Sequence, residues 1–275
     1  MTQAIQKKLN DSAFARWTAL ILVALTMFFG YMFVDVLSPL QNMLESTRGW
    51  SPTIFGLYGG SEFILNVCGF LLVAGIILDK MGVRFTGILS ASLMVLGAGI
   101  KFYGLSNYFY EGGFGYEFLS SFLTDIPASA KLACLGFMVF GCGTEMAGVT
   151  VSRAIVKWFT GKELALAMGL EMAIARLGVF AVFSLSPWVA NWGGDPSVAR
   201  PVAVVGLLLC IGLLTYIAFS VMDFKLDRQT EADTPIGETE EPFKVADLKN
   251  LFSSKTFLIV SALCVLIARR SAMPC

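Results

Sequence analysis

The chain has 275 residues, of which 56% are hydrophobic and only 15% charged, and its Lys and Arg balance its Asp and Glu. Soluble domains are about a quarter charged, so this composition and a mean hydropathy of +0.72 exclude an ordinary soluble domain and predict a membrane protein. Zero net charge leaves no basic face for a nucleic acid. The chain has no His, and its six Cys show no CxxC spacing. We expect no metal, no cofactor and, without a visible nucleophile–base pair, no enzyme activity.

Six apolar runs are long enough to cross a bilayer as helices, which takes about twenty residues. The runs are continuous, whereas barrel strands alternate apolar and polar residues. A lipid-embedded backbone must also satisfy its own hydrogen bonds. We therefore predict an all-α polytopic membrane protein, built as a six-helix bundle. The predicted spans are residues 17–39, 53–78, 85–103, 132–156, 164–189 and 198–222.

The sequence after the sixth span changes character twice. Residues 223–254 include EADTPIGETEEP, which has the composition of a linker. A further apolar run then meets Arg269 and Arg270, too early for a complete span. We predict three domains: the six-helix bundle (1–222), a cytoplasmic central linker (223–254) and a partial seventh helix (255–275).

Lys and Arg are distributed unevenly between the two sides of the predicted bundle. If the N-terminus is inside, the inner segments hold thirteen of them and the outer segments hold four, namely Arg48, Lys101, Lys131 and Arg200. Cytoplasmic loops carry an excess of basic residues. The bias predicts a multi-pass protein of the cytoplasmic (inner) cell membrane with its N-terminus in the cytoplasm.

The connection between the second and third spans reads GIILDKMGVRFTG. Its residues Gly75, Asp79, Lys80, Gly82 and Arg84 match the G-x-x-x-D-[RK]-x-G-x-[RK] loop of the major facilitator superfamily, which this chain resembles. Gly82 permits a tight turn, and Asp79 is placed to face the positive N-terminus of a neighbouring helix. The resemblance implies that the five residues form a conformational latch between two halves of a transporter.

Two opposite charges lie near the middle of consecutive spans. Glu145 stands in GTEMAG of the fourth span, and Arg176 stands in the fifth. Each costs about 2.5–3.5 kcal/mol at the bilayer centre. The two spans are joined by a short turn, so we expect them to be antiparallel and close, with the charges in a shared polar cavity. A structural ion pair is the alternative, but buried pairs are weak evidence for stability, and a zwitterionic ligand would complement both charges.

The stretch KWFTGKELALAMGLEMAIARLG, with the G-x-E segment upstream, resembles the lysosomal dipeptide transporter branch of the superfamily and its bacterial relatives. FFGYMFVD and TIFGLYGG in the first two spans agree with this resemblance. It implies transport of dipeptides by alternating access, with Glu145 at the ligand's amino group and Arg176 at its carboxylate. Arg suits this role because its planar fork can donate two hydrogen bonds to a carboxylate.

Other polar residues within the spans are weaker candidates. Tyr31 shares a helix face with Asp35, and Tyr58 shares one with Glu62. We take the two tyrosines as further substrate contacts. Glu171 is a candidate proton-coupling group, although without His we favour facilitated or carboxylate-linked movement over His-linked proton coupling.

The superfamily places its site between two halves of six helices each, whereas this chain carries the pattern of the N-terminal half and loses it after Leu266. We expect a truncated chain, for example through a frameshift, in which self-association of two half-length chains could supply the missing wall. Two alternatives stay open. One is an organic-anion carrier, which needs Arg176 but not Glu145; the other is a non-transporting membrane fragment.

Overall fold

The computed structural model describes residues 9–231 and residue 259. Contacts divide the chain into two units, Met1–Pro235 and Ile236–Cys275, and all the helices named below belong to the first. Apart from Ile259, the predicted partial seventh helix and the predicted linker after Glu231 lie outside the described residues.

The described part of the chain is helical and contains no strand, which confirms the predicted all-α class. Its long helices are α1 (Ala13–Val34), α3 (Pro52–Leu65), α4 (Leu71–Leu105), α7 (Ala128–Phe159), α8 (Leu164–Ala190) and α9 (Ala199–Glu231). Its short elements are η1 (Leu9–Asp11), η2 (Ser38–Leu40), α2 (Gln41–Arg48), α5 (Asn107–Tyr110), α6 (Tyr116–Ser120) and the π-helical segment η3 (Asn66–Phe70), which joins α3 to α4.

Five helical stretches among the described residues are long and apolar enough to cross a membrane. One of them, Pro52–Leu105, contains both the second and the third predicted spans. Gly82 breaks this stretch, because its backbone has φ 75° and ψ 174° and two helices meet there. The predicted spans thus fall on helical segments, and the second covers α3, η3 and the first part of α4. α9 continues to Glu231, beyond the predicted boundary at residue 222.

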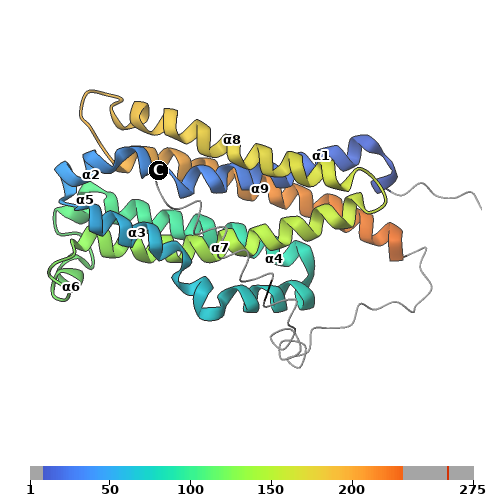
Figure 1. The fold of residues 1–275 in the computed structure, drawn as a ribbon, viewed down its shortest axis with the longest axis horizontal. Helices are drawn as coiled ribbons and strands as arrows, with labels where there is room; N and C mark the ends of the chain where they lie inside the picture. The colour runs from blue at the N-terminus through green and yellow to red at the C-terminus, as the bar shows by residue number, and fades with distance from the viewer. Residues whose placement is uncertain (1–8, 232–258, 260–275) are drawn as a thin grey trace, which may run out of the picture. The chain divides into compact units, whose positions relative to one another are not determined.

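The long helices pack as two groups of three. α1 packs along α8 and α9, while α7 packs along α3 and α4. In Figure 1, α8, α1 and α9 lie along the upper side and α3, α7 and α4 along the lower. Contacts between α4 and α9 join the groups. We expected α7 and α8 to lie close together because a short turn joins them. They share few contacts, because α8 packs chiefly on α1.

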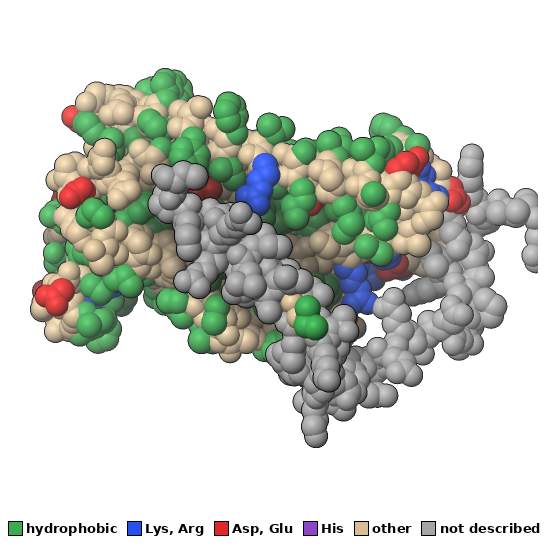
Figure 2. Space-filling view, viewed as in Figure 1, with side chains coloured by type: hydrophobic (Ala, Val, Ile, Leu, Met, Phe, Trp, Pro, Cys, Tyr) green, Lys and Arg blue, Asp and Glu red, His purple; other side chains and the backbone are tan. Residues whose placement is uncertain are grey.

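Large apolar side chains cover the outside of the bundle as well as its core. Phe180 and Val67, for example, are 74% and 84% exposed, and Figure 2 shows hydrophobic side chains along the whole length of the bundle. Soluble proteins rarely expose such continuous apolar surface, so this surface suits contact with lipid.

The two ends of the bundle are named here after the predicted charge bias. The inner end carries Gly82 and the connection between α7 and α8. The outer end carries the short helices α2, α5 and α6.

Candidate functional site

Two glycines bring the helices that carry the predicted charges against their neighbours. A Cβ atom on Gly178 of α8 would collide with the carbonyl oxygen of Phe28 on α1. A Cβ atom on Gly141 of α7 would collide with the carbonyl oxygen of Glu62 on α3. Only glycine allows backbones to approach so closely. The close packing therefore sets Arg176 beside α1 and Glu145 near α3.

Arg176 lies over the ring of Tyr31. The Arg176 Cζ atom is 5.2 Å from the centre of this ring, and the rest of the side chain is exposed. Such a cation–π contact contributes about 0.5–1 kcal/mol at an exposed site. Among residues 9–231, no carboxylate forms an ion pair with Arg176. Tyr31 thus lies beneath the guanidinium, and the N–H donors of Arg176 form no ion pair within the described residues.

Tyr31 is also the common neighbour of three carboxylates. Its hydroxyl interacts electrostatically with Glu62 of α3, with Glu145 of α7 and with Glu171 of α8, as well as with Arg176. We call these five residues the Tyr31 cluster. Glu145 is half-buried, and no ion pair joins it to Arg176 in the described part of the chain. Both signs of charge therefore act on one hydroxyl, without a direct ion pair between Glu145 and Arg176.

Tyr58, the other predicted ligand contact, lies inside the bundle. It is 3% exposed, and its ring stacks on Phe137 with 4.6 Å between the ring centres. Its hydroxyl has no hydrogen-bond partner among the described residues. The structure therefore places Tyr58 in the core rather than on an open surface, and its role as a ligand contact stays a prediction.

The latch motif lies at the inner end. Gly82 makes the turn and Gly75 lies within α4, while Lys80 is exposed. Asp79, which was predicted to face the N-terminus of a helix, forms an ion pair with Arg153 of α7. This exposed ion pair ties the motif to the fourth predicted span. The role of the motif as a latch between two halves stays a prediction.

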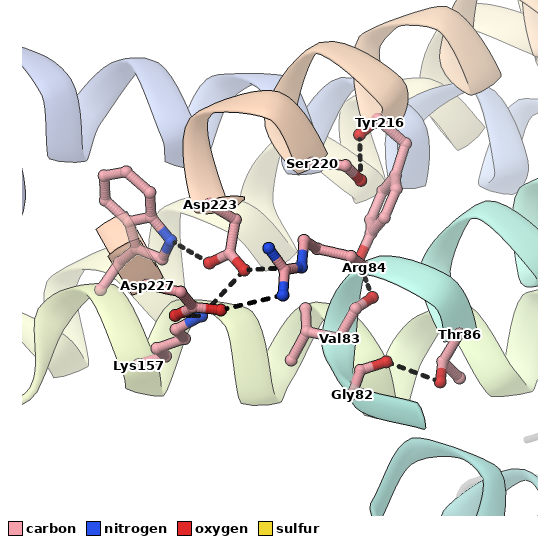
Figure 3. A network of polar contacts seen from close by, with 10 residues as sticks. Gly82, Val83, Arg84, Thr86, Lys157, Tyr216, Ser220, Asp223 and Asp227 are labelled. Carbon is pink, nitrogen blue, oxygen red and sulfur yellow. Dashed lines mark hydrogen bonds and ion pairs between the residues drawn. The ribbon is translucent and has the colours of Figure 1, made fainter. Parts of the chain in front are cut away.

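Arg84, the last residue of the motif, enters a network of charges that joins three helices (Figure 3). Its Nη2 atom is 3.2 Å from an oxygen of Asp227, and its Nε atom is 3.9 Å from an oxygen of Asp223. The Nζ atom of Lys157 on α7 is 2.8 Å from an oxygen of Asp223 and 2.6 Å from an oxygen of Asp227. Trp158 donates a further hydrogen bond to Asp223 at 3.0 Å. We call these five residues the inner network.

Sequence reasoning missed the two acids of the inner network. Asp223 and Asp227 fell within the predicted linker, yet they lie one turn apart on α9. Their four-residue spacing directly after an apolar run was the available signal. Asp223 is 1% exposed, so a buried acid stands at the centre of a network whose other charged members are partly exposed.

A cavity of about 760 Å³ lies toward the outer end and contains none of the predicted site residues. Its lining is apolar and includes Val95, Tyr103, Phe114 and Phe118. Such a lining suits a hydrocarbon chain and offers no partner for a zwitterion. Among the described residues, no group of acids and cysteines could hold a metal ion.

Comparison with known proteins identifies the family. The chain matches the Major Facilitator Superfamily over residues 20–271, and it belongs to this superfamily, a class of multi-pass membrane transporters. The match extends over most of the sequence, including the latch motif and the Tyr31 cluster.

Several curated relatives bear the name lysosomal dipeptide transporter MFSD1. The Gallus gallus protein is 31% identical over 135 residues, which cover 47% of this chain and 30% of the relative. The Danio rerio protein is 33% identical over 131 residues, covering 46% and 28%. The Pongo abelii protein is 24% identical over 265 residues, covering 92% of this chain and 51% of the relative. The chain thus spans about half the length of the relatives at most.

Proposed function

We propose that the chain takes part in moving dipeptides across a membrane by alternating access, with Glu145 and Arg176 binding the two ends of the ligand. The observation that carries the proposal is the Tyr31 cluster. There Arg176 and Glu145 approach the same tyrosine without forming an ion pair with each other. The shared name of the relatives supports dipeptides as the ligand class.

The chemistry of the cluster fits a zwitterion. A guanidinium fork binds a carboxylate with two hydrogen bonds, and a carboxylate accepts hydrogen bonds from an ammonium group. Because every dipeptide has these two termini, the same pair would accept many side chains. The charge bias supports a cell membrane with the N-terminus in the cytoplasm as the location, although the relatives are named as lysosomal.

The test uses the purified chain in lipid vesicles and labelled Ala-Ala as the probe, with binding and uptake measured together. We expect saturable binding that falls at least tenfold in Glu145→Gln and in Arg176→Ala. Arg176→Lys should recover only part of the binding, because it keeps the charge but loses the fork. Glu117→Gln is the matched control, since Glu117 is an exposed glutamate near the outer end. Unchanged binding in both cluster variants, or no saturable binding in the parent, would contradict the proposal.

Blocked ligands separate dipeptide binding from the organic-anion alternative. An anion carrier requires Arg176 but not Glu145, so it should accept N-acetyl-Ala-Ala as well as Ala-Ala. A clamp on both termini should reject N-acetyl-Ala-Ala and also Ala-Ala amide. A non-transporting fragment would show neither specific binding nor uptake.

A further inference from the structure

A fully buried lysine lies in a cage of aromatic rings within the outer half of α4. Lys101 is 0% exposed. Its Nζ atom is 4.3 Å from the centre of the Phe33 ring, 4.6 Å from that of Phe137 and 5.0 Å from that of Tyr58. It donates one long hydrogen bond, of 3.5 Å, to the carbonyl oxygen of Phe33. The charge bias counts Lys101 with the outer segments, yet three other elements enclose it.

One member of the Tyr31 cluster, the buried Glu62, also interacts with this cage. Glu62 is 5% exposed, and it interacts electrostatically with Lys101 on one side and with Glu145 on the other. Its main chain is held in place, because the Asn66 amide donates to the Glu62 carbonyl oxygen and to that of Gly141, at 3.3 Å in each case. Glu62 is therefore fixed in position while its charge affects two sites.

Glu62 and Lys101 do not form a locked ion pair. Among the described residues, the Glu62 carboxylate makes no ion pair, and the Lys101 ammonium contacts rings and a carbonyl instead. A structural pair needs direct hydrogen bonds to offset the cost of removing both charges from water. Ionisable residues inside membrane spans commonly mark proton pathways. A carboxylate that is buried without such bonds is suited to exchanging a proton.

The other charged and titratable groups around the pair come from each neighbouring element. Asp35, directly after α1, acts on both Glu62 and Lys101. Tyr58 of α3 interacts electrostatically with Glu62 and Asp35, and Tyr31 of α1 also interacts with Glu62. Glu62 and Asp35 both act on the Lys101 ammonium, and Glu145 of α7 acts on Glu62, so negative charge is in excess when Glu62 is ionised.

We propose that Glu62, with Lys101 as its buried counter-cation, is a proton-binding site linked to the other residues of the Tyr31 cluster. The proton leaves the Glu62 carboxyl group for water when the ammonium group of a dipeptide enters the cluster. The positive charge of the dipeptide then offsets the negative charge that Glu62 gains when it loses its proton. The linkage to a dipeptide rests on the proposed function, whereas proton binding by Glu62 can be tested without any ligand.

The direction of the effect follows from reciprocity between two ligands of one protein. If the ammonium group favours ionised Glu62, dipeptide binding releases a proton and strengthens as the pH rises. Release of one proton changes the affinity by at most about tenfold per pH unit. Below and above the range in which Glu62 titrates, the affinity should be independent of pH.

The first measurement is infrared spectroscopy of the purified chain in lipid, between about pH 8 and about pH 5. Acidification should reveal the carbonyl band of a protonated carboxylic acid that is absent in Glu62→Gln. Glu45→Gln is the control, because Glu45 is exposed on α2. In Lys101→Met the band should persist to a more alkaline pH than in the parent, because loss of the nearby cation favours the protonated carboxyl group. Lys101→Arg keeps the cation and should resemble the parent. An unchanged band in Glu62→Gln would overturn the proposal.

The second measurement adds Ala-Ala at a pH where the band is partly developed. We expect the band to shrink and a pH dye to report proton release, in the parent but not in Glu62→Gln. If Ala-Ala binds but the band does not change, the linkage is wrong. If Ala-Ala does not bind to the parent, the proposed function and the linked release both fail. The band alone then decides whether Glu62 binds a proton.

Discussion

The inner network and the Tyr31 cluster are both groups of charges within the same bundle, yet their charges are paired differently. In the inner network, Asp223 and Asp227 each contact both Arg84 and Lys157. In the Tyr31 cluster, Arg176 contacts a ring and forms no ion pair within residues 9–231. Direct pairs hold α4, α7 and α9 together, whereas the cluster leaves its charges available.

The difference separates two uses of charge in a low-dielectric environment. A buried charge with several partners fixes helices relative to one another, and removing one partner leaves the others uncompensated. A charge without a partner lowers stability, but it can bind a ligand of opposite sign. Substitutions in the inner network should therefore change stability most, and substitutions in the cluster should change binding most.

The largest expected effect is on the buried acid of the inner network. Asp223→Ala should lower the free energy of unfolding by about 3 kcal/mol, because Lys157 and Trp158 lose their shared acceptor. Asp227→Ala is the matched control. Asp227 is 29% exposed, so its loss should cost less than about 1 kcal/mol. Unfolding in mixed micelles measures both values, and equal losses would show that burial does not distinguish the two acids.

The next largest effect is expected at the turn of the latch motif. The backbone of Gly82, with φ 75° and ψ 174°, occupies a region that residues with a side chain rarely adopt. Gly82→Ala should cost about 1–3 kcal/mol in the same unfolding measurement. Gly75→Ala is the control, because Gly75 is helical and has open space around it. It should be neutral or slightly stabilising. Similar losses at both positions would contradict the strained-turn interpretation.

A smaller effect, on binding rather than stability, is expected at Tyr31. Tyr31→Leu removes the ring beneath Arg176 and should weaken binding of labelled Ala-Ala about three- to fivefold, as expected for a contact of about 1 kcal/mol. Tyr31→Phe keeps the ring and should bind within about twofold of the parent. If the Phe variant loses as much affinity as the Leu variant, the hydroxyl and not the ring positions the ligand.

The smallest effect is expected for the ion pair between Asp79 and Arg153. Both side chains are more than a third exposed, so solvent and salt screen their attraction. A double-mutant cycle with Asp79→Asn and Arg153→Gln should give a coupling below about 1 kcal/mol. The coupling should fall further in high salt. A coupling as large as the loss in Asp223→Ala would show that this pair is a structural link too.

The helices and their approximate ends were predictable because each apolar run is about as long as a bilayer is thick. Gly82 was predictable as a turn because it falls between two such runs. The end of α9 was not, since EADTPIGETEEP and the charges before it have the composition of a linker. The helix continues to Glu231, and the contacts of Asp223 and Asp227 with other helices accompany this continuation.

The candidate site was predictable only one residue at a time. A charge in an apolar run singles out Glu145 and Arg176, but their common neighbour depends on how α8 packs against α1. Tyr31 emerged as this neighbour only in three dimensions. Lys101 shows the same limit. It stands near the end of an apolar run, and only the rings of Phe33, Tyr58 and Phe137 reveal that it is buried.

The ion pairs of the inner network, which join α9 to α4 and α7, have a mechanical consequence. Asp223 and Asp227 lie about two turns and about one turn before Glu231, the last described residue of the helix. Further along α9, Thr26 donates a hydrogen bond to the Gly212 carbonyl oxygen, and Tyr216 donates one to the Val83 carbonyl oxygen. A displacement of the inner end of α9 would therefore be transmitted by the two acids to α4 and α7, and by these hydrogen bonds to α1 and α4. Within the described bundle, α9 and its neighbours would move together.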